Sequence, residues 1–216
     1  MNNEPILPEE EISPEPESQP EPKNPTRSLA AVLFDYLEMF AWSVFAVLIL
    51  FTFAIRLCRV DGQSMENTLE NGQNLLLYNI AYTPRQDDIV VFHLTKPEVG
   101  LQKTLVKRVI ATGGQKVEVN FRECTVTVDG ERYADSHSIL KNFSDVKIGY
   151  YTLTAEHDYN AATGIFSVTV PEHCLFVMGD NRNNSKDSRD NDVSFIDERC
   201  VLGKAVLRLY PFTVFS

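Results

Sequence analysis

The longest apolar run of the chain predicts a helix that crosses a membrane. Residues 39–55 read MFAWSVFAVLILFTFAI, with no charge and no Pro or Gly. Extended to Leu57 and back across Glu38 to Leu37, the run reaches about the 20 residues that span the hydrocarbon of a bilayer. We therefore expect a transmembrane anchor within residues 28–57. A helix buried in the core of a soluble protein is the alternative.

A cleaved secretory signal peptide does not fit this run. Such a peptide begins near the N-terminus with basic residues, has a shorter apolar stretch and ends at small residues. Here the run begins only at Met39 and ends on bulky side chains before Arg56. Positive charges do not set its orientation, because Lys23 and Arg27 on one side balance Arg56 and Arg59 on the other.

Residues 58–216 carry the pattern of a mainly β domain. Alternating apolar and polar positions in KVEVNF and TVTV indicate half-buried strands, whereas the continuous runs IVVF and LFVM favour strands covered on both faces. The expected strands cover residues 74–82, 88–94, 104–111, 116–121, 124–130, 166–171, 174–180 and 201–212. Short strands separated by turns predict an antiparallel barrel or sandwich. Residues 132–165 have weak periodicity and are expected to form a small excursion.

The segment before the apolar run has a different composition. Residues 1–27 hold seven Glu against Lys23 and Arg27, and seven of the 11 Pro lie before residue 26. Such a segment buries too little apolar surface to offset its ordering entropy. We expect a disordered acidic tail; a docking motif within it is the alternative.

Charge and cysteine content limit the partners. The net charge of −10 argues against nucleic acid, whose phosphates need clustered Lys and Arg. It also weakens attraction to anionic lipid, so attachment to a bilayer must be hydrophobic. Four cysteines without a CxxC motif make a zinc site a poor hypothesis, and one disulfide among them stays open. We expect no metal and no cofactor.

Lys107 is a candidate general base. In the strand-like LVKRVI both faces are apolar, so periodicity does not decide whether Lys107 or Arg108 points inward. Arg keeps its proton in proteins, whereas burial lowers the pKa of a Lys toward neutrality. If this strand carries a base, it is therefore Lys107. A lysine on an edge strand, with its amine in solvent, is the alternative.

A candidate nucleophile lies in the turn-like stretch Asp61 to Ser64. Gly62 gives this backbone the freedom to approach a substrate closely. A Ser–Lys pair is a known variant of serine activation. A Ser/His/Asp arrangement stays open, because four histidines compete for the role of base. These are His93, His137, His157 and His173.

A polar stretch, MGDNRNNSKDSRDND, directly follows the apolar strand CLFV. A solvated loop is the simplest interpretation of residues 178–192. The stretch also holds arginines and carboxylates that can pair bidentately and make the loop rigid enough to support a catalytic group. The candidate pairs join Arg182 or Arg189 to Asp180, Asp187 or Asp190.

Taken in order, these motifs resemble bacterial type I signal peptidases, the membrane-bound Ser–Lys endopeptidases of the S26 family, and most closely the Gram-positive type. DGQSMENTL (61–69) is similar to the nucleophile box and DDIVVF (87–92) to the strand that follows it. LVKRVIATGG (105–114) is similar to the lysine box and GDNRNNSKDSR (179–189) to the C-terminal box. The resemblance covers roughly residues 30–212. Endoplasmic-reticulum relatives have His at the position of Lys107, so the bacterial branch fits better.

The resemblance implies catalytic roles. Ser64 would be the nucleophile, its backbone N–H an oxyanion donor, and Lys107 the general base. Met65 would pack under the nucleophile. Some members carry a hydroxyl residue at the position of Gly62, so a second oxyanion donor stays unassigned. Many have Pro where this chain has Asn67, which removes no catalytic atom.

The same resemblance implies a supporting set of residues. Ser185 would hydrogen-bond the Lys107 amine and orient it. Asp187 and Arg189 would form an ion pair near the site, and Asp180 would support the same loop.

The function implied is removal of signal peptides from exported preproteins through an acyl-enzyme, with small residues at the first and third positions before the cut. Signal-peptide-bearing preproteins, the lipid bilayer and the secretion translocon would be the partners. The tail would be cytoplasmic and the catalytic domain extracytoplasmic. Two alternatives remain: a Ser–Lys protease of the self-cleaving repressor type, and an inactive membrane-tethered binding module.

Overall fold

The structure is a computed structural model that describes residues 28–97, 100–138, 158–160, 162–190 and 192–215. The predicted tail, most of the predicted excursion and His157 lie outside these residues. The chain divides into two compact units, Met1–Val44 and Phe45–Ser216.

The apolar run forms a helix without a covered face. The α-helix α1 spans Leu29–Ile49 and continues into a π-helical turn, η1, over Leu50–Ala54. The segment Leu29–Thr52 is long and apolar enough to cross a membrane, and none of it is buried in the protein. An apolar helix with no protein cover fits a lipid surrounding and not a soluble core. The last three residues of the predicted anchor, 55–57, lie in strand β1, which spans Ile55–Arg59.

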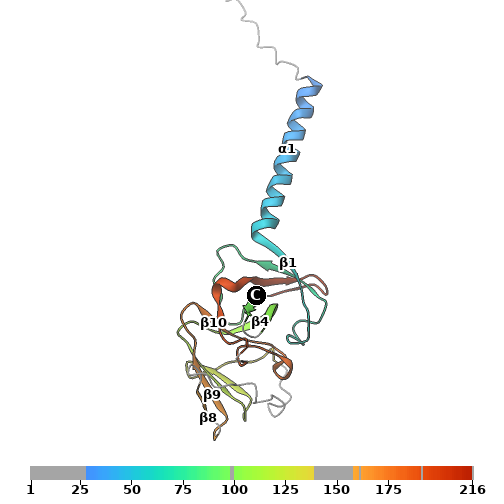
Figure 1. Ribbon diagram of the computed structural model, residues 1–216. Helices are drawn as coiled ribbons and strands as arrows, with labels where there is room; N and C mark the ends of the chain where they lie inside the picture. The colour runs from blue at the N-terminus through green and yellow to red at the C-terminus, as the bar shows by residue number, and fades with distance from the viewer. Residues whose placement is uncertain (1–27, 98–99, 139–157, 161, 191, 216) are drawn as a thin grey trace, which may run out of the picture. The chain divides into compact units, whose positions relative to one another are not determined.

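Most of the expected strands form one antiparallel sheet. Within the described residues its order is β1-β2-β12-β3-β4-β10-β11, with β13 paired to β12. Figure 1 labels β1, β4 and β10 of this sheet. Its strands are β1 Ile55–Arg59, β2 Asn74–Tyr78, β3 Ile89–Lys96, β4 Leu101–Thr112, β10 Cys174–Met178, β11 Ile196–Asp197, β12 Val201–Arg208 and β13 Thr213–Val214. Short 3-10 turns lie at Arg182–Asn184 (η5) and Glu198–Cys200 (η6).

The remaining strands form a second antiparallel sheet, in the order β7-β6-β5-β9-β8. Its strands are β5 Lys116–Asn120, β6 Thr125–Val128, β7 Glu131–Arg132, β8 Asp158–Asn160 and β9 Ile165–Thr169. The described parts of the excursion predicted at 132–165 include β8 and the start of β9, which belong to this sheet. The mainly β, antiparallel fold after one apolar helix is confirmed.

Three clusters of buried side chains explain the two kinds of strand pattern. In β3, Ile89 and Val91 pack on one face of the first sheet, while Val90 and Phe92 pack on the other. The run IVVF is thus covered on both faces, as predicted. Burial alternates in β5 and β6, which present one face to the core.

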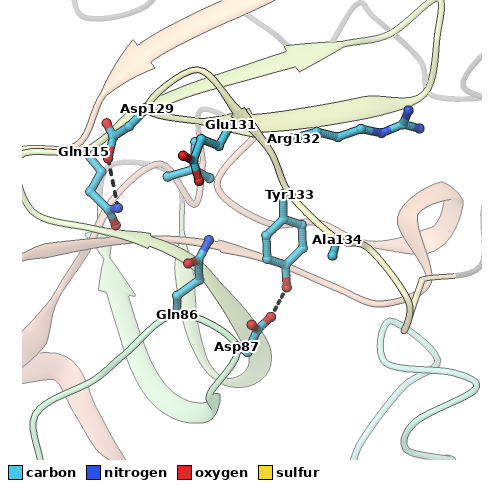
Figure 2. A pocket seen from close by; sticks show the side chains of 9 residues that line it. Gln86, Asp87, Gln115, Asp129, Glu131, Arg132, Tyr133 and Ala134 are labelled. Atoms are coloured by element: carbon cyan, nitrogen blue, oxygen red, sulfur yellow. Dashed lines mark hydrogen bonds between the residues drawn. The ribbon is translucent and has the colours of Figure 1, made fainter.

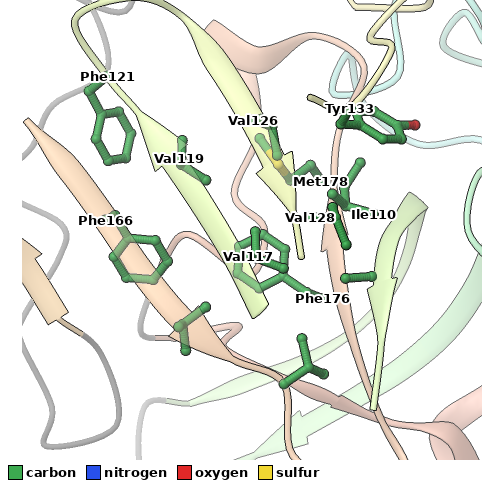
Figure 3. Close-up of a cluster of buried hydrophobic side chains, with 13 residues drawn as sticks. Ile110, Val117, Val119, Phe121, Val126, Val128, Tyr133, Phe166, Phe176 and Met178 are labelled. Atoms are coloured by element: carbon green, nitrogen blue, oxygen red, sulfur yellow. The ribbon is translucent and has the colours of Figure 1, made fainter. Parts of the chain in front are cut away.

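One of these clusters joins the two sheets. Ile110 of β4 and Phe176 of β10 pack against Val117 and Phe166 of the second sheet (Figure 3). Tyr133, just after β7, belongs to the same cluster. The second sheet therefore packs directly on the two strands that carry the lysine box and lead into the polar loop.

Candidate active site

Lys107 and Ser64 are in direct contact. Lys107 lies in β4 opposite Val90 of β3, and its side chain is only 2% exposed. Its Nζ donates hydrogen bonds to Ser64 Oγ at 2.6 Å and to the Val106 carbonyl at 3.1 Å. The alternative of an edge-strand lysine with its amine in solvent is wrong.

The surroundings of Lys107 favour its neutral form. Burial lowers the pKa of this amine from 10.5 to about 8. The carboxylate of Asp187 acts in the opposite direction, whereas the cations Lys103 and Arg189 lower the pKa further. An appreciable fraction of the amine is therefore unprotonated near neutral pH and can accept a proton.

Two buried side chains hold the turn that carries Ser64. Met65 and Leu69 are 1% and 0% exposed and belong to one core cluster. The N–H groups of Thr68 and Leu69 both donate to the Met65 carbonyl, at 3.0 and 2.7 Å. Ser64 itself stays partly exposed, so its hydroxyl is fixed in place yet open to a substrate.

Gly62 meets a backbone requirement of the same turn. Its φ is +104°, in the region that favours glycine, and no atom lies within 4 Å of the position a Cβ would take. Its N–H donates to Asn71 Oδ1 at 3.0 Å. Backbone conformation, and not crowding, selects glycine here.

Asp187 and Arg189 form a buried ion pair in the polar loop. Arg189 Nε and Nη2 donate to the two carboxylate oxygens at 2.8 and 2.9 Å, and the Gly179 N–H donates to Oδ2 at 2.9 Å. Burial alone would raise the pKa of Asp187, but Arg189 and these hydrogen bonds hold it below its usual value. Asp187 is thus a fixed negative charge close to Lys107.

Ser185 does not hydrogen-bond Lys107 in this structure. Its Oγ is buried and has no partner of hydrogen-bond geometry within the described residues, although it helps to lower the pKa of Asp187. The side chain lies against Gly179, where a Cβ would overlap both Ser185 and the Ser64 carbonyl. Gly179 therefore lets the polar loop approach the nucleophile turn. The role predicted for Ser185 stays a prediction.

Asp180 pairs with Arg108 and not with an arginine of its own loop. Arg108 Nε and Nη2 donate to Asp180 at 2.9 and 2.7 Å, and both side chains are buried. The Thr68 hydroxyl donates to the same carboxylate. Two adjacent residues of β4 thus contact the nucleophile region. Lys107 hydrogen-bonds Ser64, and Arg108 binds Asp180, whose carboxylate also holds the turn that carries Ser64.

Sequence reasoning missed several residues that hold the nucleophile turn. The Asn181 N–H donates to the Ser64 carbonyl at 3.0 Å, and its side-chain amide donates to the Gln63 carbonyl at 3.2 Å. Arg208 Nη1 donates to the Thr68 carbonyl at 2.9 Å. Asn181 lies inside the polar motif, which was the only available signal; nothing in the sequence pointed to Arg208.

The alternatives left open by the sequence find no support in the described residues. No histidine among them hydrogen-bonds Ser64, and His93 contacts Thr104 instead. No group of three or more His, Cys, Asp or Glu there could hold a metal ion. The four cysteines, all in the described part of the chain, are free thiols.

A serine hydroxyl hydrogen-bonded to a buried lysine amine, on an antiparallel β domain, defines the class of Ser–Lys serine peptidases. Residues 33–210 match the family described as signal peptidase, peptidase S26, and the chain belongs to this family.

Several relatives carry the same name. Signal peptidase I of Bacillus caldolyticus is 33% identical over 176 residues, which cover 80% of this chain and 88% of the relative. Probable signal peptidase I-1 of Synechocystis is 33% identical over 70% of this chain and 69% of its own length. Signal peptidase IB of Staphylococcus aureus is 32% identical over 73% and 78%. A crystal structure of a signal peptidase I from Enterococcus faecalis V583 covers 57% of this chain and 97% of its own, with 26% identity and a TM-score of 0.36.

The protein is therefore a serine endopeptidase of the signal peptidase I type, which removes signal peptides from preproteins. Within the described residues, one helix is long and apolar enough to cross a membrane, which fits a single-pass membrane protein. Neither a self-cleaving repressor-type protease nor an inactive binding module is favoured.

Proposed function

We propose that Ser64 is the nucleophile and Lys107 the general base of this signal peptidase. The observation that carries the proposal is the 2.6 Å hydrogen bond from the buried Lys107 amine to Ser64 Oγ. When the amine is neutral, it takes the hydroxyl proton as Oγ attacks the scissile carbonyl. An acyl-enzyme forms, the mature protein leaves with a new amino terminus, and water then releases the signal peptide.

The Ser64 backbone N–H is the proposed oxyanion donor. Within the described residues this N–H donates to no other group, so it is available for the charge that develops on the substrate carbonyl. Gly62, at positive φ, shapes the backbone just before it. Met65, buried beneath the turn, keeps this donor in place.

The proposed supporting set around the reacting pair comprises Asp187, Arg189, Asp180 and Ser185. Asp187 is a fixed carboxylate close to the amine, and Arg189 keeps it ionised. Asp180 connects β4 to the nucleophile turn through Arg108 and Thr68. We expect Ser185→Ala to weaken cleavage without abolishing it, because Ser185 packs against Gly179 beside the nucleophile. Unchanged cleavage would remove Ser185 from the set.

The proposed substrate is an extended preprotein segment with small residues at the first and third positions before the cut. We propose that shallow pockets built by apolar strands limit side-chain size at these positions, and an extended peptide places alternate side chains on the same face. We propose that the segment pairs with an exposed strand edge.

The proposed orientation has the tail in the cytoplasm and the catalytic domain outside, in contact with the bilayer and near the secretion translocon. Ser64 follows Thr52, the last residue of the apolar segment, by 12 positions (64 − 52). A site this close along the chain to the end of the span suits a cleavage region that has just left the membrane.

The test is incubation of the detergent-solubilised full chain with a synthetic preprotein, with the cut site read by mass spectrometry. Ser64→Ala and Lys107→Ala should each abolish cleavage while circular dichroism stays native. Lys116→Ala is the matched control, because this lysine is exposed on the second sheet. Full activity in either site variant would overturn the assignment.

A further inference from the structure

The chain that follows β7 contacts the loops around the active site. Tyr133 is buried in the cluster that joins the two sheets, and its hydroxyl donates to the Asp87 carboxylate (Figure 2). Asp87 lies two positions before Ile89, where β3 begins, and its carbonyl accepts from Arg108 Nη1 at 2.9 Å. Tyr133 thus fixes the position of the residues that come next.

Two residues further on, Asp135 binds Arg182 of the polar loop. Arg182 Nη2 donates to Asp135 Oδ1 at 2.9 Å, and Nη1 forms an ion pair with Oδ2. The Arg182 side chain is 0% exposed and that of Asp135 is 15% exposed. Burial lowers the pKa of Arg182, and the nearby cation Arg189 lowers it further. Asp135 is the carboxylate that opposes this lowering most strongly. Asp135 is therefore the main counter-charge of a fully buried cation.

Arg182 in turn holds the backbone nearest the nucleophile. Its Nε donates to the Gly179 carbonyl at 2.9 Å, and its own carbonyl accepts from Arg189 Nη2 at 2.9 Å. Gly179 contacts the Ser64 carbonyl, and its N–H donates to Asp187. A continuous set of contacts thus runs from Asp135 through Arg182 and Gly179 to Ser64.

We propose that Asp135 is a positioning residue for catalysis, through which the segment after β7 fixes the loop that carries Asp187 and contacts Ser64. The proposal rests on the assignment of Ser64 and Lys107 as the reacting pair. Asp135 itself touches neither of them. Without its carboxylate, a buried guanidinium would keep only a weaker counter-charge beside the cation Arg189, so the loop would shift to hydrate it. A small shift at Gly179 moves the Ser64 turn, and such displacements cost much activity.

The first experiment compares Asp135→Asn, Asp135→Glu and the matched control Glu131→Gln in the full-length, detergent-solubilised protein. Glu131 is an exposed carboxylate four positions earlier, in strand β7. We expect Asp135→Asn to lower kcat on the order of 10- to 100-fold with little change in KM, because the fault lies in alignment and not in substrate binding. Asp135→Glu, which keeps the charge, should regain most of kcat, and Glu131→Gln should match the wild type. A folded Asp135→Asn protein with wild-type kcat would overturn the proposal.

A second variant, Arg182→Met, keeps the proposal testable if Asp135→Asn alone fails to fold. Arg182→Met removes the buried cation, so adding Asp135→Asn to it should cost nothing further if Asp135 acts through Arg182. If Asp135→Asn lowers kcat further in the Arg182→Met background, Asp135 has a role independent of Arg182, which contradicts the proposal.

Hydrogen exchange separates this inference from the proposed function. The N–H groups of Gly179 and Asn181, bonded to Asp187 and to the Ser64 carbonyl, should exchange faster in Asp135→Asn and not in Glu131→Gln. If Asp135→Asn exchanges faster but the wild type cleaves no preprotein, the contact between Asp135 and the loop is supported and the proposed function is rejected. Unchanged exchange with normal wild-type cleavage would reject Asp135 alone.

Discussion

The Lys107 amine donates a 2.6 Å hydrogen bond to Ser64 Oγ across 43 positions of the chain. Ser64 is held in a turn by buried Met65 and Leu69, and Lys107 is held in a strand covered on both faces. The two groups are therefore already in contact before a substrate binds, so no conformational entropy is lost to bring them together during the reaction. Such prior positioning accelerates a reaction.

Lys107→Arg tests the need for a group that can lose its proton. Arginine keeps the charge and approximate length of lysine but stays protonated at every usable pH. We expect preprotein cleavage to fall to the level of Lys107→Ala. A working arginine variant would contradict the general-base role, since guanidinium cannot accept the hydroxyl proton.

The pH dependence of kcat/KM follows from the lowered pKa of Lys107. The reactive form is the neutral amine, and burial places the pKa at about 8. We expect kcat/KM to rise roughly tenfold per pH unit below that value and to level off above it. Asp187 raises this pKa, so residual activity of Asp187→Asn should level off at lower pH. A flat profile from pH 6 to 10 would be inconsistent with this base.

Lys107→Met should be inactive yet more stable than the wild type at pH 7. The pKa is 10.5 for an ordinary lysine and about 8 in the folded protein, so the buried amine costs about 3 kcal/mol below pH 8. Lys107→Met removes this cost but also loses the two hydrogen bonds of the amine, which reduces the gain in the free energy of unfolding by about 1–2 kcal/mol.

The sign of this effect can be checked by varying the pH. Between pH 8 and 10.5 the unfolded chain binds more protons at this site than the folded one, so wild-type stability rises with pH there. The advantage of Lys107→Met should therefore shrink across the same range. Denaturant unfolding at several pH values measures it, and a constant difference would show that the amine is not desolvated.

Gly179→Ala should disable the site by steric overlap. A Cβ there would overlap the Ser185 side chain and the Ser64 carbonyl, and this carbonyl is part of the backbone of the nucleophile turn, so relief of the overlap shifts that turn. We expect about 1–3 kcal/mol of destabilisation and a loss of cleavage on the order of 100-fold. Gly130→Ala is the control, because its added Cβ lies in open space at a positive φ and carries only a backbone cost. Equal activity in the two variants would argue against close packing at Gly179.

Arg208→Ala should loosen the far end of the nucleophile turn. Arg208 donates to the carbonyls of Thr68 and Pro211 and to the Thr213 hydroxyl, at 2.9, 2.9 and 2.6 Å. We expect about a tenfold fall in kcat and about 1–3 kcal/mol lower stability, because three acceptors lose a charged donor. Lysine at this position reaches fewer of them and should give an intermediate kcat. Arg199→Ala, with a side chain 88% exposed, should leave kcat unchanged.

Much of the β architecture could be predicted from the pattern of side chains. Continuous apolar runs such as IVVF become strands covered on both faces, and alternating runs such as KVEV become half-buried strands, because each pattern states how many faces must leave water. The strand at Ile55–Arg59 was missed, since its apolar residues continue the membrane run without a break. Which strands belong to which sheet was not predicted, because the pattern of a single strand does not identify the strand beside it.

The amino-acid pattern alone was enough to predict the apolar span and most strands, because burial leaves a periodic local signature; the motif order also brought Ser64 and Lys107 forward together. The partners of two other buried charges, Arg108 and Arg182, became known only from the folded chain. Arg108 meets Asp180 across 72 positions and Arg182 meets Asp135 across 47, while nearer carboxylates of the polar loop bind other groups. The physical reason is that an ion pair depends on the distance and burial of two charges in space, and neither quantity is written in the order of residues along the chain.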